Sequence, residues 1–224
     1  MLATLGRSID HVLRGQTLAA ETARLSLPRL LAFILTFGFF YGAIMGSFGV
    51  TPGRVMQPVY SGAKVPLLLI VTFLMSVPSF WVLNALLGVS ADFGQSLRAL
   101  VTTQAALTVV LASLAPFTVF WYASFTDYHN AILFNAVMFG LASVAAQWLL
   151  RTLYRPLIAR NPRHRLLLRF WLIIYAFVGI QLGYVLRPFI GDPALSVSFF
   201  RADSWGNAYM YVLDLMWKAA TGHS

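Results

Sequence analysis

The stretch VPLLLIVTFLMSVPSFWVLNALLGVS, residues 65–90, contains no charged side chain and is long enough to cross a membrane as a helix. Crossing the hydrocarbon core of a bilayer takes about 20 predominantly apolar residues. Four further apolar stretches lie at 28–48, 99–123, 130–150 and 170–189, with charged side chains only near their ends. The sequence therefore predicts an all-α, polytopic transmembrane helical bundle of five spans.

The composition supports a membrane protein rather than a soluble one. Of the 224 residues, 59% are hydrophobic and 10% are charged, whereas charged residues make up about a quarter of a soluble domain. The formal net charge of +9 does not indicate nucleic-acid binding, because the arginines lie at span ends and not on a folded basic face. Only two of the 16 basic residues are lysines, which favours a bacterial protein and hence the bacterial cytoplasmic (inner) membrane.

The distribution of basic residues predicts the orientation of the spans. With the N-terminus in the cytoplasm, eleven basic residues fall on the cytoplasmic side and five on the outer side, as the positive-inside rule requires. We therefore expect an N-in, C-out bundle over 28–190. An amphipathic segment at 1–27 and an outer C-terminal segment at 191–224 are expected to form interfacial helices. The aromatic stretch 205–217 is short for a crossing, but a sixth span there would return the C-terminus to the cytoplasm.

Small residues on two spans predict close helix packing. Gly38, Gly42 and Gly46 recur every four residues and form a glycine-lined ridge, and Gly179 and Gly183 form a shorter G-x-x-x-G pattern. Such ridges let transmembrane backbones approach each other closely. The partner of the first ridge is either another span of this chain or another protein. Within the chain, contact between the first and fifth spans is the simplest pairing.

Three amides predict a polar layer inside the bundle. Asn84, Gln104 and Gln147 each lie about seven residues to the cytoplasmic side of the middle of their span, and therefore near one depth. Amides in hydrocarbon require hydrogen-bond partners. The layer is either a set of interhelical hydrogen bonds or the floor of a cavity that faces the cytoplasm.

The loops carry the remaining signals. The segment 151–169 combines His164 with six arginines, and we expect it to attract anionic lipid headgroups; the arginines are Arg151, Arg155, Arg160, Arg163, Arg165 and Arg169. The segment LRPFIGDP, residues 186–193, predicts a structured collar on the outer face. The glycine- and proline-rich segment 49–64 predicts a loop. We expect the titratable residues 127–129 to form a solvated turn.

Catalytic and metal chemistry are not indicated. The four histidines lie in predicted tails or loops, no Ser lies in a nucleophile-elbow motif, and the chain has no cysteine. We therefore expect no cofactor, no metal site and no enzymatic activity.

Five spans, a basic N-terminal tail and a second span containing Pro66 and Pro78 resemble the architecture of Yip1-type small membrane proteins. The resemblance covers residues 28–190 and implies a non-enzymatic scaffold or membrane-organising role, without transferring any functional residue. We expect a scaffold or subunit that packs with itself or with other membrane proteins. The alternative is a small channel or carrier whose cavity floor is the amide layer.

Overall fold

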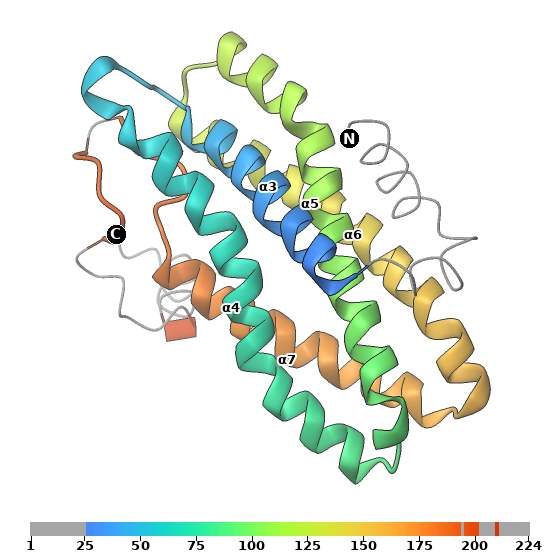
Figure 1. Ribbon diagram of the computed structural model, residues 1–224. Coiled ribbons are helices and arrows are strands. Elements are labelled where there is room, and N and C mark those ends of the chain that lie inside the picture. The colour runs from blue at the N-terminus through green and yellow to red at the C-terminus, as the bar shows by residue number, and fades with distance from the viewer. Residues whose placement is uncertain (1–25, 194, 202–208, 211–224) are drawn as a thin grey trace, which may run out of the picture.

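The computed structural model describes residues 26–193, 195–201 and 209–210, which form helices joined by short connections (Figure 1). The α-helices are α3 (Leu27–Gly46), α4 (Met56–Leu86), α5 (Phe93–Ser124), α6 (Tyr128–Arg160) and α7 (Arg163–Val185), and short 3-10 turns η2 (Pro52–Arg54) and η3 (Ser90–Asp92) precede α4 and α5. The described residues contain no strand, and these five helices are long and apolar enough to cross a membrane. Both findings confirm the predicted class of fold.

The predicted helices at 1–27 and 205–217 lie outside the described residues, apart from short pieces at 26–27 and 209–210. The connections α4–α5 and α6–α7 lie together at one end of the bundle, which we call the basic end because the arginines of 151–169 gather there. The connections α3–α4 and α5–α6 and the segment 187–201 form the opposite end, which we call the collar end.

The predicted loop at 49–64 is wrong over most of its length, because α4 already begins at Met56. Gly49 has φ +60° and turns the chain after α3. Pro52 opens η2, and Pro58 lies in the first turn of α4. A proline in a first turn removes no helical hydrogen bond. Prolines that indicated a loop therefore mark the start of a helix.

The basic segment 151–169 is also helical apart from residues 161–162, so the prediction of a long connection between spans is wrong. α6 continues to Arg160 and α7 begins at Arg163, so that only Asn161 and Pro162 separate them. Arginine is a good helix former, and its long side chain extends a charge away from apolar surroundings. The 33 residues of α6 measure about 50 Å, more than the roughly 30 Å hydrocarbon core.

The central helix of the bundle is α5, which packs against α3 and α6, while α4 packs against α3 and α7. Every residue from 99 to 106 of α5 is buried. The hydroxyl of Thr108 also links two helices, because it lies 3.4 Å from the Phe33 carbonyl of α3 and 2.8 Å from the Ala105 carbonyl of its own helix. The core is thus organised around α5, and α7 lies at the edge.

The glycine ridge of α3 packs against α4 of the same chain. A methyl group added at Gly42 would lie 2.9 Å from the Cα atom of Gly62, and one at Gly46 would lie 2.6 Å from the Cβ atom of Ser61. Gly38 faces Pro66 at an ordinary contact distance of 3.4 Å. The two helices therefore pack most closely at Gly42 and Gly46 and less closely at Gly38.

The expected pairing of the first and fifth spans is therefore wrong. The neighbour of Gly179 on α7 is Thr72 of α4, 3.5 Å from an added methyl group. Such a group at Gly183 would meet no atom of the described residues within 4 Å. Spacing alone showed that the glycines lie on one face, but it carried no information about the helix opposite.

Candidate ligand-binding cavities beside α6 and α7

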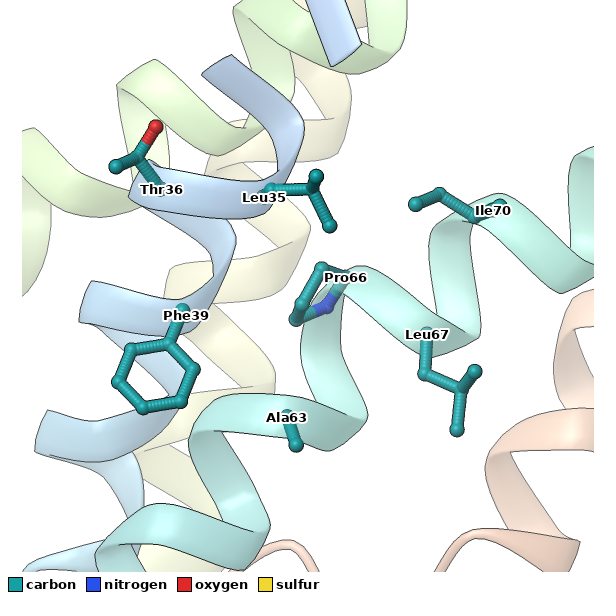
Figure 2. A pocket seen from close by; sticks show the side chains of 7 residues that line it. All are labelled: Leu35, Thr36, Phe39, Ala63, Pro66, Leu67 and Ile70. Atoms are coloured by element: carbon teal, nitrogen blue, oxygen red, sulfur yellow. The ribbon is translucent and has the colours of Figure 1, made fainter. Parts of the chain in front are cut away.

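A groove between α3 and α4 has a volume of about 520 Å³ and is almost entirely apolar. Its lining residues are Leu35, Thr36, Phe39, Ala63, Pro66, Leu67 and Ile70 (Figure 2). Thr36 is the polar residue among them, and its hydroxyl donates to the Ala32 carbonyl of its own helix. The groove therefore presents no group that would orient a polar ligand.

A second cavity, which we call the central cavity, has a volume of about 640 Å³ and lies between α4, α5, α6 and α7. Hydrophobic side chains form most of its wall. Its polar lining residues come from all four helices and are Thr72, Thr103, Gln104, Ser143, Gln147 and Tyr175. None of the described lining residues is charged. Neutral amides and hydroxyls therefore set the polar chemistry of this cavity.

Two polar atoms of these lining residues lack a partner. The Thr72 hydroxyl oxygen and the Gln147 Oε1 atom are buried and have no hydrogen-bond partner among the described residues. A buried polar group without a partner costs about 1–3 kcal/mol. Such groups are rare in native proteins and need a specific explanation. A polar molecule in the adjacent cavity would supply the missing hydrogen bonds.

The structure brings two members of the predicted amide layer together and separates the third. Gln104 and Gln147 both line the central cavity, but Asn84 does not. Asn84 lies two residues before the end of α4, whereas the glutamines lie about 17 and 20 Å from the basic ends of α5 and α6. The Asn84 amide is fully buried and donates to the Phe80 carbonyl at 2.8 Å. Asn84 thus lies near a helix end, whereas Gln104 and Gln147 lie well inside their helices.

The space for the central cavity arises from the course of α7. Figure 1 shows α7 diverging from α6 beyond their short connection, and the two helices make few contacts. α7 instead packs on α4, and α6 on α5. A gap between α6 and α7 follows from these two pairings.

A collar formed by residues 187–193 and 195–201 follows α7 and is bound to α4 and α6. The Lys64 ammonium group is fully buried and donates to the Pro188 carbonyl at 2.7 Å. The Ser61 hydroxyl donates to the Phe189 carbonyl, and the Tyr128 hydroxyl donates to the Ile190 carbonyl at 3.2 Å. The segment after α7 is thus bound through its backbone to α4 and α6, as the sequence predicted for a structured collar.

The third cavity, which we call the collar pocket, lies beneath this segment and has a volume of about 700 Å³. Its polar lining residues are Tyr128, His129, Asn135, Arg187, Asp192 and Arg201. Leu68 and Phe139 line both the collar pocket and the central cavity, so the two cavities adjoin at these residues. The predicted solvated turn at 127–129 is therefore part of a pocket wall, although Asp127 also caps α6 by accepting from the Asn130 amide at 2.7 Å.

A network around Asn135 was not anticipated from the sequence. The Tyr41 hydroxyl of α3 donates to Asn135 Oδ1 at 3.1 Å, and Asn135 Nδ2 donates to the Tyr122 hydroxyl of α5 at 2.7 Å. Tyr122 in turn donates to the Met45 carbonyl at 3.0 Å. These bonds join three helices beside the collar pocket. An isolated asparagine in a span indicates a need for partners but does not identify them.

The basic end contains a buried histidine that the sequence placed in a solvated connection. His164 is fully buried, and its Nε2 atom lies 3.1 Å from an Asp92 carboxylate oxygen. Arg160 reaches the same carboxylate at 3.7 Å. Asp92 and His164 are 72 residues apart, so no local pattern linked them. All six arginines of 151–169 are exposed at this end.

Within the described part of the chain, no three His, Asp or Glu side chains gather closely enough to hold a metal ion. The fold and the cavities define a five-helix membrane protein with a neutral polar cavity among its helices. No protein-family model, curated protein or solved structure matches the chain.

Proposed function

We propose that this is a non-catalytic integral membrane protein that takes up a small, uncharged polar molecule in the central cavity, as a small carrier would. The observation that supports this most is the pairing of Gln104 and Gln147 in a cavity where two buried polar atoms lack partners. Amides and hydroxyls donate and accept hydrogen bonds without requiring a charged ligand.

The proposal includes an orientation. The exposed arginines of the basic end favour a cytoplasmic location for that end in a bacterial inner membrane, with the collar on the outer side. The basic end would also attract anionic lipid headgroups. A non-enzymatic role agrees with the architectural resemblance to Yip1-type proteins.

The experiment uses single cysteines placed in a chain that has none. Gln104→Cys and Gln147→Cys should react with N-ethylmaleimide in intact membranes, because a hydrated cavity allows the reactive thiolate to form. Asn84→Cys is the matched control, because Asn84 is fully buried outside the cavity and should remain unlabelled. Gln95→Cys is the positive control, because Gln95 is exposed and a cysteine there should react fully. Labelling at 104 and 147 no faster than at 84 would show a dry cavity and would reject the proposal.

The second candidate is a subunit or scaffold in a membrane assembly. The edge position of α7 leaves apolar side chains exposed, among them Ile173, Phe177 and Ile180. Another transmembrane helix would cover these side chains by van der Waals packing. If the protein migrates as a monomer without other proteins in mild detergent, and cysteines at 104 and 147 are labelled, the carrier is favoured. If it forms a stable complex and both cysteines are unreactive, the subunit is favoured.

A further inference from the structure

The collar pocket has an excess of positive charge. Arg187 and Arg201 line it, with Asp192 as the acidic residue among its described lining residues. The Arg187 guanidinium lies over the Tyr184 ring, 3.6 Å from its centroid, and this contact orients the side chain. Buried Lys64 lies directly behind the collar. This arrangement suits an anionic group better than a neutral or cationic one.

A smaller polar cavity of about 240 Å³ adjoins the collar pocket, and we call it the annex. The annex shares Pro188, Asp192 and Arg201 with the collar pocket, and Ser196 and Ser198 add hydroxyl groups. A ligand whose anionic group lies at Arg201 could thus extend further polar atoms into the annex.

The annex also contains a buried acceptor without a donor. Gln57 lines it and is 1% exposed; its Nε2 atom donates to the Ser61 hydroxyl at 3.1 Å. The Gln57 Oε1 atom is buried and has no partner among the described residues. An amide oxygen in this state is satisfied by a hydrogen-bond donor such as a hydroxyl group.

The collar pocket also has an apolar wall. Ile132, Ala136 and Phe139 extend along α6 below the charged groups, and Ile132 and Ala136 are exposed on the side of the gap. A hydrocarbon chain lying there would cover apolar surface within the bilayer. The pocket therefore combines a cationic upper part with an apolar lower part, which matches an amphiphile.

We propose that the collar pocket and the annex bind one anionic phospholipid with a hydroxyl-bearing headgroup. Its phosphate lies between Arg187 and Arg201, its headgroup hydroxyls face Gln57, and an acyl chain lies along Ile132 and Ala136. This site lies at the opposite end of the bundle from the exposed arginines of 151–169. It does not rest on the ligand proposed for the central cavity.

The experiment measures lipid retention by native mass spectrometry of the full-length protein in mild detergent, with phosphatidylglycerol as the probe. The wild-type protein should retain one phosphatidylglycerol in preference to phosphatidylcholine. The double variant Arg187→Gln, Arg201→Gln should bind it roughly thirtyfold more weakly, since each basic side chain near an anionic headgroup contributes about a factor of five. Glycerol phosphate added without acyl chains should not displace the lipid, because it lacks the contact with α6.

Two control variants separate this pocket from general charge effects and from misfolding. Arg151→Gln with Arg155→Gln removes the same charge from exposed positions at the basic end and should leave retention unchanged. Ile132→Trp alters an apolar, 40% exposed position, should leave thermal unfolding unchanged, and should lower retention without any change of charge. Equal retention of phosphatidylcholine, or an equal loss in the basic-end variant, would overturn the proposal. Displacement by glycerol phosphate would indicate a free phosphate ester as the ligand and would also overturn it.

Discussion

The α3–α4 interface and the gap between α6 and α7 represent opposite extremes of packing within one bundle. Along α3, glycines bring two backbones together so closely that added methyl groups at Gly42 and Gly46 would clash. Along α7, Gly179 meets its neighbour at an ordinary contact distance, and Gly183 faces open space. The same G-x-x-x-G spacing therefore accompanies a closed interface in one place and a loose one in the other.

The comparison shows where a binding site can form in such a bundle. Helices in lipid gain little from burying apolar area, so close van der Waals contact and hydrogen bonds hold them together. The α3–α4–α5 part supplies this contact. α7 diverges from α6, and a cavity lined by Gln104 and Gln147 lies between the helices.

The largest expected effect comes from breaking the closed interface. Gly42→Ile should lower the free energy of unfolding by at least about 3 kcal/mol, because a branched side chain forces two backbones apart. Thermal unfolding in detergent, followed by circular dichroism, measures this change. Gly183→Ile is the matched control, since it makes the same substitution in a helix where no described atom lies within 4 Å. Equal destabilisation by both variants would contradict the assignment of the ridge to α4.

An intermediate effect is expected at the boundary between the two regions. Asn135→Leu should cost about 1–2 kcal/mol of unfolding free energy, because it removes the hydrogen bonds to Tyr41 and Tyr122. Unfolding by sodium dodecyl sulfate titration measures the change. Tyr41→Phe removes only one of these bonds and should cost less. A larger loss from Tyr41→Phe would mean that ring packing, and not the network, stabilises this boundary.

The smallest effect on stability is expected inside the gap. Ser143→Leu fills part of the central cavity, and it should change the unfolding free energy by less than about 1 kcal/mol. The same substitution should slow maleimide labelling of Gln104→Cys, because the added side chain displaces water from the cavity. Val144→Leu changes the adjacent residue, which is 70% exposed, and should leave labelling unchanged. Labelling that persists in the Ser143→Leu variant would place the route to Gln104 elsewhere.

The predicted spans and the long apolar helices of the described residues agree in number and differ in length. The sequence located the apolar stretches because each must be long enough to cross the bilayer. It ended the fourth span at 150, whereas α6 continues to Arg160. A hydropathy pattern shows where the apolar stretch of a span ends. The helix itself can continue beyond the hydrocarbon core. Asn84, by contrast, lies close to the end of its helix, away from the cavity that Gln104 and Gln147 line.

The hydrogen-bond partners of buried polar groups were also not predictable from the sequence. The sequence showed that Asn135 and His164 are polar, but Tyr41, which bonds to Asn135, and Asp92, which bonds to His164, lie 94 and 72 residues away along the chain. Depth along a span placed Gln104 and Gln147 at a similar level, and both residues line the central cavity. The collar was foreseen as a structured segment because of its prolines and glycine. Its attachment to Lys64 was not, since Lys64 was placed in a loop.

The sequence by itself determined that the chain forms apolar helices, how many of them could span a membrane, and which faces carry small residues. These features depend on local composition and helical periodicity, because an apolar solvent leaves the helix as the simplest way to satisfy the backbone of each segment. The tertiary structure alone decided that the glycine ridge meets α4, that α7 diverges from α6, and that the collar covers a cationic pocket. Each of these depends on the fit between surfaces distant in sequence, where many weak contacts compete and no single residue specifies the partner.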